Sequence, residues 1–405
     1  MSAEAETSTA ASALEQFRLD TRQWLEHNCP PSQRKPITSE EQVWAGRRQT
    51  FPSEDARRWF ERMRDRGWTV PGWPREYGGA GLSPQECQVL EEEMQRLKCR
   101  IPLYDQGIWM LGPALLEFGN EQQKRDHLPR IARGEIRWCQ GYSEPGAGSD
   151  LASLQCKAEL QGDHFLVNGT KIWTTFGDKA DWIFCLVRTD PSAPKQEGIS
   201  FLLIDMAQEG ITVSPIPLIS GESEFCQTFF DNVKVPVENL VSELNKGWSV
   251  AKGLLKHERT LMAKMSTANQ RVSNLPAAEM ARRYAPMVDG KLADASLRER
   301  LVEHEMNFRA LGLTHFRTYE ERLHGIQSSV SLIMKYVGTE EEKRRTELQV
   351  ALMGSRGLGW KGDGFSDEEL LATRGMLFAK ALSIAGGTSE VQLNIIAKRA
   401  LGLPE

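Results

Sequence analysis

Hydrophobic residues at helical spacing dominate the first third of the chain. One face of the first helical stretch consists of Leu14, Phe17, Thr21 and Leu25. The same period returns between Leu111 and Phe118, and loops rich in Pro and Gly at 71–74 and 77–81 separate the helical stretches. We therefore predict an α-helical N-terminal domain over residues 1–135.

The period of the pattern changes near residue 136. Short segments rich in β-branched and aromatic residues follow one another, with Gly, Asp and Pro between them, at 136–141, 164–169, 182–187, 199–204 and 228–235. Segment 164–169 ends in Asn168-Gly169, which is typical of a strand that enters a tight turn. The pattern predicts a central antiparallel β domain, a sandwich or a barrel, over residues 136–245.

Helical periods return from about residue 246 to the end. They cover 247–275, 296–336, 340–352 and 366–402, the last with a break near 386. The stretch 276–295 contains Pro276, Pro286 and Gly290, so we predict a loop there. Residues 246–405 are expected to form a C-terminal helical bundle, which makes the chain an α+β multidomain protein.

Composition and charge narrow the functional classes. The 405 residues carry 50 basic and 55 acidic side chains, without the basic excess expected of a nucleic-acid-binding protein. The seven cysteines stand singly and the seven histidines lack metal-ligand spacing, so we predict neither a disulfide framework nor a metal site. Apolar runs are too short for a membrane span, and the acidic first 16 residues resemble no targeting signal. A cytoplasmic protein is expected.

The loop from Tyr142 to Asp150 directly follows a predicted strand. Pro145, with Gly146 and Gly148, forces a compact turn that exposes backbone N–H groups beside the hydroxyls of its serines. Such a loop suits a phosphate or the polar edge of a ring. An ordinary β-turn fits the same residues equally well.

A second candidate segment runs from Lys171 to Gly177. Trp173 followed by Thr174 and Thr175 at a strand end supplies a flat aromatic face beside two hydroxyls. Taken alone, the segment fits a core tryptophan in a strand of β-branched residues better than it fits a ligand site.

Together these segments resemble the acyl-CoA dehydrogenase family, and the resemblance runs through nearly the whole chain. The motifs that carry it, by their order and spacing, are 74–81, 143–150, 168–177, 230–236 and 386–391. The resemblance implies a C-terminal four-helix bundle after the helical and β domains, with FAD between the last two. The FAD contacts that it implies are Tyr142, Ser143, Gly148, Ser149, Trp173, Thr174, Thr175, Thr388 and Glu390.

Residues 357–362 match the GxGxxG pattern of dinucleotide-binding loops. No strand is predicted before them and no βαβ unit surrounds them, so we interpret them as a transition from helix to loop. The family has a glycine-rich stretch here near the adenine of FAD, which Gly354 matches approximately. Two departures bear on FAD contacts between subunits. Residues 281–286 lack the Phe-Gly of the family's Arg-Lys-Thr-Phe-Gly type segment, and Ala351 stands where many members have Gln.

Glu258 lies in the centre of an apolar stripe on the helix predicted from Gly247 to Asn269. The residues one turn before and after it are Leu254, Leu255, Leu261 and Met262. A carboxylate there is costly unless it is paired, neutral or functional, and apolar surroundings bring a carboxyl group toward the operating range of a general base. A structural salt bridge, with Arg259 or a residue of a neighbouring helix, fits the same position.

The resemblance favours catalysis by Glu258. Most acyl-CoA dehydrogenases have the catalytic Glu in a Tyr-Glu-Gly-Thr segment, where this chain has Ala385-Gly386-Gly387-Thr388. The isovaleryl-CoA dehydrogenase branch has the same gap and carries its base in a Leu-Glu-Arg-Leu segment, which residues 257–261 match. The resemblance further implies that the Gly386 N–H binds the enolate oxygen. Substrate contacts are expected from Ser149, Arg259 and Ala385.

The implied reaction is the α,β-dehydrogenation of an acyl-CoA. Glu258 removes the α-proton while a β-hydride passes to FAD, which gives a trans-2-enoyl-CoA. Electrons are expected to pass to an electron-transfer flavoprotein, and the chain is expected to form a homo- or hetero-oligomer, a dimer or a tetramer.

Small residues at 385 and 386 leave space beside the reacting carbons, so we expect a branched, alicyclic or bulky acyl group. Two alternatives stay open: an FAD-bearing partner subunit of a heteromeric dehydrogenase, and a flavin oxidase or monooxygenase on the same fold.

Overall fold

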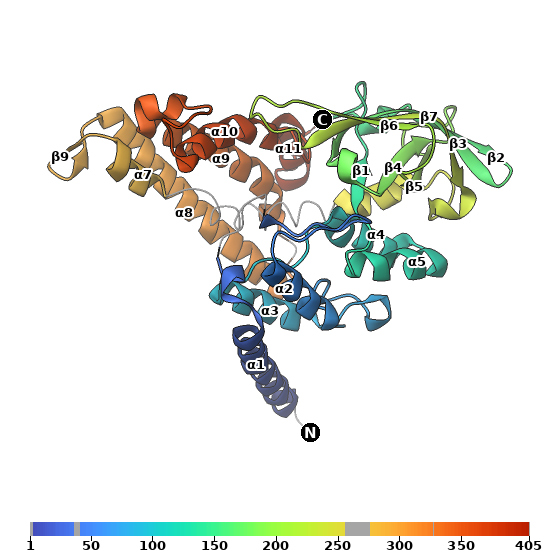
Figure 1. Cartoon of the computed structure of the whole chain (residues 1–405), viewed down its shortest axis with the longest axis horizontal. Coiled ribbons are helices and arrows are strands. Elements are labelled where there is room, and N and C mark those ends of the chain that lie inside the picture. The colour runs from blue at the N-terminus through green and yellow to red at the C-terminus, as the bar shows by residue number, and fades with distance from the viewer. Residues whose placement is uncertain (1–2, 36–40, 256–275, 327, 405) are drawn as a thin grey trace. The chain divides into compact units, whose positions relative to one another are not determined.

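The computed structural model of the protein contains two compact units (Figure 1). The structure describes residues 3–35, 41–255, 276–326 and 328–404. The first unit comprises Met1–Ile216 and Glu224–His257, and the second comprises Pro217–Ser223 and Glu258–Glu405. The N-terminal helices and the strands between residues 138 and 241 therefore belong to one unit. The residue boundaries of the three predicted domains stay predictions.

Capping side chains set where helices of the first unit begin. Ser53 caps the second helix, and Ser83 forms a capping box with Glu86 at the start of the third. Asn120 forms a capping box with Gln123 at the start of the fifth. The helices are α1 (Ala3–Asn28), α2 (Glu54–Asp65), α3 (Pro84–Arg96), α4 (Gly112–Phe118) and α5 (Glu121–Ala132), with short helical turns at Pro31–Gln33, Arg75–Tyr77 and Gly107–Leu111.

An eight-stranded sheet follows these helices. Its strands are β1 (Trp138–Gly141), β2 (Lys157–Gln161), β3 (His164–Thr175), β4 (Trp182–Arg188), β5 (Ile199–Asp205), β6 (Ile211–Pro215), β7 (Phe225–Pro236) and β8 (Leu240–Val241). Their order is β6-β7-β3-β2-β4-β5-β8, with β1 beside β4. All pairings are antiparallel except those of β4 with β1 and, at one position, with β2. The predicted β domain is confirmed.

The turn predicted at Asn168-Gly169 is wrong, because β3 continues through both residues. The tight turn lies earlier, between β2 and β3, where Gly162 has a φ of 66°. Gly169 is required for a different reason. The register of β3 with β7 shifts there, and a Cβ on Gly169 would lie 2.7 Å from the Cα of Cys156. Close approach of two backbones, rather than a turn, therefore selects glycine.

Alternation along β4 and β5 gives the sheet two buried faces. Phe184 and Phe201 stack with ring centroids 6.0 Å apart in a cluster that also contains Phe60 of α2. Cys185, which points the other way, belongs to a second cluster together with Val235 of β7. The shared first cluster explains why the N-terminal helices and the sheet form one unit.

A buried carboxylate joins the helical region to β1. Asp105 is 1% exposed and accepts hydrogen bonds from the N–H of Gly107, at 2.7 Å, and of Trp138, at 3.1 Å. Burial raises the pKa of Asp105 to about 7, although the two N–H groups act in the opposite direction.

The second unit is helical apart from one short hairpin. Its elements are α7 (Ala277–Tyr284), β9 (Met287–Val288), β10 (Lys291–Leu292), α8 (Ala295–Leu323), α9 (Met334–Met353), α10 (Asp367–Leu382) and α11 (Ser389–Ile395), with short helical turns at Ser329–Ile333, Gly354–Leu358 and Ile396–Ala400. Helix α9 packs against α7, α8 and α10 (Figure 1). Leu348 and Leu352 of α9 form a core with Ala281 of α7 and Ala372 of α10. The predicted C-terminal helical domain is confirmed.

Two predictions within this unit are wrong. The expected loop 276–295 contains helix α7, because Pro276 stands at its N-cap, where a missing N–H costs no helical hydrogen bond. The expected helix 296–336 ends at Leu323, and α9 begins at Met334. Gly325, two residues after the end of α8, has a φ of 69°, which does not continue a helix, whereas Gly338 lies inside α9.

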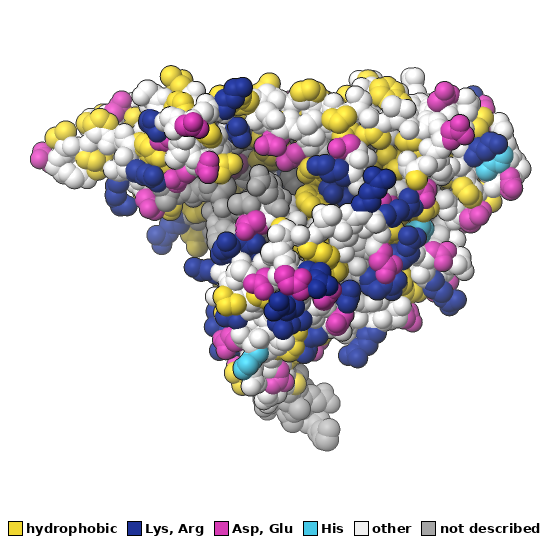
Figure 2. Space-filling view, in the orientation of Figure 1, with side chains coloured by type: hydrophobic (Ala, Val, Ile, Leu, Met, Phe, Trp, Pro, Cys, Tyr) yellow, Lys and Arg dark blue, Asp and Glu magenta, His cyan; other side chains and the backbone are white. Residues whose placement is uncertain are grey.

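No helix in the described part of the chain is long and apolar enough to cross a membrane. None of the seven cysteines, all of which lie in the described part of the chain, forms a disulfide. On the face drawn in Figure 2, basic and acidic side chains are interspersed.

Candidate cofactor and active site

The loop from Tyr142 to Asp150 follows β1 and forms a tight turn. Glu144 and Ala147 exchange two backbone hydrogen bonds of 3.0 Å, with Pro and Gly at the tip between them. Gly148 and Ser149 are exposed, and a Cβ built on Gly148 meets no atom within 4 Å. The N–H groups of these two residues find no acceptor among the described residues. The loop thus presents backbone donors beside open space, an arrangement that suits an anion.

Trp173 is the extra residue of a β-bulge at the end of β3. The register of β3 with β7 shifts between Ile172 and Thr174, so the residue between them has no partner across the ladder. The φ of Trp173 is 62°, which is rare for a bulky side chain, and the residue is 52% exposed. Bulges redirect side chains and occur often beside active sites. The exposed ring excludes the core role that the sequence alone favours for Trp173.

The two threonines after Trp173 differ in environment. Thr174 has no exposed surface, and its hydroxyl lies 3.0 Å from the carbonyl oxygen of Cys226 and 2.9 Å from the hydroxyl of Thr228. Thr175 is half-buried. The Thr174 side chain therefore belongs to the interior of the sheet, which leaves only its backbone for a ligand.

A buried ion pair lies behind the loop and was not singled out from the sequence. Nζ of Lys171, which has no exposed surface, lies 2.7 Å from Oε1 of Glu144 and 3.1 Å from the carbonyl oxygen of Tyr142. The sequence signal that could have found the buried lysine is the alternation of inward and outward side chains along β3. Phe165 and Val167 point inward from β3, and Lys171 continues the same series of every second residue after Gly169.

Aromatic and cationic side chains support the residue after the threonines. Phe176 has a φ of 51°, and its ring centroid lies 4.8 Å from that of Trp44. The guanidinium of Arg137, a residue 7% exposed, lies 4.0 Å from the Trp44 ring centre and 5.2 Å from the Phe176 ring centre. Cation–π contacts thus hold the turn that ends the Trp173 segment.

In the second unit, two left-handed glycines precede α11. Gly386 has a φ of 66° and Gly387 a φ of 98°, and Thr388 caps the helix by accepting from the Val391 N–H at 3.3 Å. The Gly386 N–H finds no acceptor among the described residues. Its carbonyl accepts from the side chain of Gln392 at 3.1 Å. The turn therefore has a fixed shape and an available backbone donor.

The neighbours of this turn are open. Ala385, Gly386 and Glu390 are exposed, and a hydrogen bond from its own backbone is the largest cause of the lowered pKa of Glu390. Gly354, at the end of α9, has a φ of 56° and open space where a side chain would stand. Residues 357–362 follow a helix and a short helical turn, as predicted, and no strand precedes them.

The predicted base lies outside the described residues, and so does Arg259. The helix that the sequence predicts for this segment is described from Gly247 to Leu255. Leu254 has no exposed surface and Leu255 packs against the same core, so the apolar stripe reaches the turn before Glu258.

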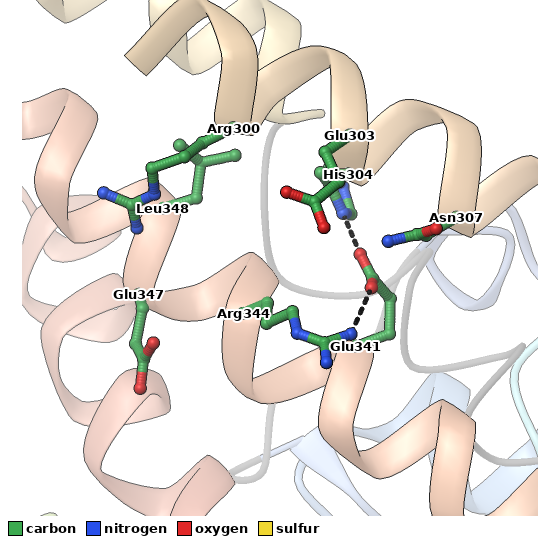
Figure 3. Close-up of a pocket in the computed structure, with 8 residues that line it drawn as sticks. All are labelled: Arg300, Glu303, His304, Asn307, Glu341, Arg344, Glu347 and Leu348. Carbon is green, nitrogen blue, oxygen red and sulfur yellow. Dashed lines mark hydrogen bonds and ion pairs between the residues drawn. The ribbon is translucent and has the colours of Figure 1, made fainter. Parts of the chain in front are cut away.

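A pocket of about 130 Å³ lies between α8 and α9 (Figure 3). His304 of α8 and Glu341 of α9, both buried, are joined by a 2.6 Å contact between Nδ1 and Oε1. Arg344 lies 3.5 Å from the second oxygen of the carboxylate. The lining is otherwise Arg300, Glu303, Asn307, Glu347 and Leu348. It contains none of the predicted site residues, and we interpret it as a structural ion-paired contact between two helices.

Three family domains match successive parts of the chain. The N-terminal domain of acyl-CoA dehydrogenase matches residues 12–135, the middle domain matches 139–233 and the C-terminal domain matches 245–401. The chain is 35% identical over 393 residues to the acyl-CoA dehydrogenase IpdE1 of Mycobacterium tuberculosis, covering 96% of this chain and 98% of the relative.

Two solved structures have the same fold. One is the Tcur3481-Tcur3483 steroid ACAD, with a TM-score of 0.74 and 29% identity over 97% of this chain and 98% of that one. The other is the ChsE4-ChsE5 complex of Mycobacterium tuberculosis, with a TM-score of 0.72 and 28% identity over 97% and 98%. Because the three domain matches follow one another in the family's order and a relative matches almost end to end, the chain belongs to the acyl-CoA dehydrogenase family of flavoprotein oxidoreductases, which act on acyl-CoA.

Proposed function

We propose that the chain is an FAD-dependent dehydrogenase that converts an acyl-CoA thioester into a trans-2-enoyl-CoA. The observation that carries the proposal is Trp173, whose half-exposed ring stands on a left-handed bulge. A bulky residue in that conformation costs free energy, and such strain is typically kept where it serves a site.

The residues of the first unit fit a flavin. The exposed face of Trp173 offers a stacking surface, and the N–H groups of Gly148 and Ser149 suit the pyrophosphate. Tyr142, Ser143 and Thr175 are further proposed contacts, and Thr174 contributes its backbone. In the second unit the proposed contacts are Gly354, Thr388 and Glu390. FAD, when bound, accepts the hydride from the β-carbon of the substrate.

Glu258 is the proposed general base, which takes the α-proton of the thioester. Leu254, which is buried, and Leu255, which packs against the same core, precede Glu258 in the chain. We propose that these apolar neighbours keep water from competing for that proton. The Gly386 N–H, which has no acceptor among the described residues, is the proposed donor to the developing enolate oxygen. Ser149 and Arg259 are proposed to bind the remainder of the substrate.

A bulky acyl group is the proposed substrate class. Ala385 and Gly386 are small and exposed, where most family members have Tyr and Glu, so a branch or ring gains contacts there that a straight chain lacks. The similarity to a protein named as a steroid ACAD supports the same class.

We further propose that the chain acts as a subunit of an oligomer and passes electrons to an electron-transfer flavoprotein. The names of both solved relatives pair two proteins. Residues 281–286 also lack the family's usual segment for FAD contacts between identical subunits. A heteromer is therefore the favoured assembly.

The test is anaerobic flavin bleaching. The chain, purified alone and together with candidate partner subunits, should be yellow and should bleach with a bulky acyl-CoA. Glu258→Gln should bind the same thioester but bleach at least about 100-fold more slowly. Glu197→Gln, an exposed carboxylate outside the proposed site, should leave bleaching unchanged.

A chain that takes up no FAD with any partner would contradict the cofactor assignment. Wild-type bleaching rates in Glu258→Gln would instead refute only the base. Rapid reoxidation of the bleached enzyme by air would favour the oxidase alternative.

A further inference from the structure

The buried pair Lys171–Glu144 is unusual for the number of segments it joins. Glu144, 8% exposed, accepts hydrogen bonds from the backbone N–H of Gln155, at 2.6 Å, and of Cys156, at 2.8 Å. The same carboxylate receives Nζ of Lys171 at 2.7 Å. Water cannot replace these partners, because the lysine has no exposed surface. A buried charge that loses its partner is strongly destabilising, so the three segments are held at fixed separations.

Each partner stands next to one half of the proposed flavin surface. Glu144 directly follows Ser143 at the start of the loop, and Lys171 precedes Trp173 by two residues on β3. The backbone adds one more link, since the N–H of Ile172 donates to the carbonyl oxygen of Ser143 at 2.9 Å. The ion pair therefore lies beneath the surface, while the ring of Trp173 and the N–H groups of the loop lie upon it.

Because of the β-bulge, the position of the ion pair affects the direction of the Trp173 ring. Lys171 keeps the inward direction of the strand, and the register shift after Ile172 turns Trp173 outward. The direction of the ring thus depends on how β3 sits against the loop behind it. A rigid planar ligand that contacts both halves requires their spacing to be set before binding, because ordering the surface on binding would reduce affinity.

We propose that Lys171 and Glu144 are positioning residues, which fix the spacing between the Ser143–Ser149 loop and the Trp173–Thr175 segment so that one flavin contacts both. Neither side chain is assigned a contact with the flavin, because Lys171 has no exposed surface and Glu144 is buried. The proposal rests on the proposed function and adds to it the internal element that shapes the cofactor surface.

Three variants separate positioning from general stability. Lys171→Met removes the cation and leaves a buried carboxylate, which is expected to lower the melting temperature. Lys171→Met with Glu144→Gln removes both charges and should recover much of that loss. The N–H groups of Gln155 and Cys156 bind different carboxylate oxygens of Glu144, and in glutamine an NH2 donor replaces one of those oxygens, so one of the two N–H groups faces a donor instead of its acceptor. Glu93→Gln is the matched control. Glu93 is 2% exposed and binds Arg22 and Arg96 far along the chain from the loop.

The first readout needs no cofactor. Backbone amide hydrogen exchange of apo-protein peptides covering 142–156 should accelerate in the double variant and stay at the wild-type rate in Glu93→Gln. The second readout is FAD affinity, measured by fluorescence titration, together with the visible spectrum and reduction potential of the bound flavin. FAD affinity in the double variant should fall about tenfold or more, as when an outer partner of a ligand-binding residue is lost at a metal site.

Unchanged exchange in 142–156, or wild-type FAD affinity and potential in a stable double variant, would overturn the proposal. So would an equal loss of affinity in Glu93→Gln, because the effect would then follow stability alone. A wild-type protein that binds no FAD would refute the proposed function, and the exchange measurement would still decide whether the pair orders the loop.

Discussion

The hydroxyl groups of Thr174 and Thr228 lie 2.9 Å apart inside the sheet, and neither residue has exposed surface. Thr174→Val should therefore lower the free energy of unfolding by about 1–2 kcal/mol, because the partner hydroxyl loses a buried hydrogen bond. The same variant should bind FAD with wild-type affinity. Thr175→Val should do the reverse, with a stability change within about 0.5 kcal/mol and weaker FAD binding. Thermal melts and FAD titrations of both variants check the pair, and a changed flavin spectrum in Thr174→Val alone would contradict it.

Asp105 predicts a dependence of stability on pH. Because burial raises its pKa to about 7, the folded protein keeps a proton that the unfolded chain loses near pH 4. Asp105 therefore makes the free energy of unfolding fall as pH rises from about 4 to 7. Asp105→Asn does not titrate, so the stability difference between wild type and variant should shrink by more than about 1 kcal/mol between pH 5 and pH 8. Denaturant unfolding at both pH values measures it, and a constant difference would show that Asp105 does not titrate in this range.

The His304–Glu341 contact predicts how α8 and α9 are held together. His304→Leu leaves a buried carboxylate without its partner and should cost about 2 kcal/mol or more. Arg344→Gln should cost less than about 0.5 kcal/mol, since the Arg344 side chain is 60% exposed. A double variant with Leu at 304 and 341 should recover part of the loss. Equal effects of His304→Leu and Arg344→Gln in thermal melts would argue against a structural role for the buried pair.

Substrate shape is tested at Ala385. Filling the position with Tyr should lower kcat/KM for cyclohexanecarboxyl-CoA and isovaleryl-CoA more than for octanoyl-CoA, because the added ring occupies the space proposed for a branch. Wild-type preference for octanoyl-CoA among the three, together with no selective loss in Ala385→Tyr, would show that other residues fill the gap. Flavin content, measured in parallel, separates a pocket effect from loss of FAD.

The order of the domains could be predicted because the spacing of hydrophobic residues along a helix or strand depends on that element alone. The segments rich in β-branched and aromatic residues that contain Phe184 and Phe201, and the long helices of the second unit, can be recognised without knowledge of their neighbours. The failures have a tertiary cause. Gly169 marks a close approach to Cys156 rather than a turn, and Pro276 begins a helix rather than preventing one.

Sequence motifs located the 142–150 loop and the Trp173 segment of the candidate site. They did not reveal the buried residues that hold these two segments together. Lys171 and Glu144 lie 27 residues apart in the chain, and only the folded structure shows that they meet. Period likewise does not distinguish the exposed Trp173 from the buried Thr174, because the bulge between them breaks the alternation on which the prediction rests.

The left-handed backbone of Trp173 also has an evolutionary consequence. Asparagine and glycine adopt a φ near 62° more readily than tryptophan, so either should stabilise the empty protein while removing the ring. Selection for folding alone would favour such replacements at this position. A tryptophan in this conformation thus implies a trade-off between stability and activity, and descendants of this chain that no longer bind the cofactor should lose it early.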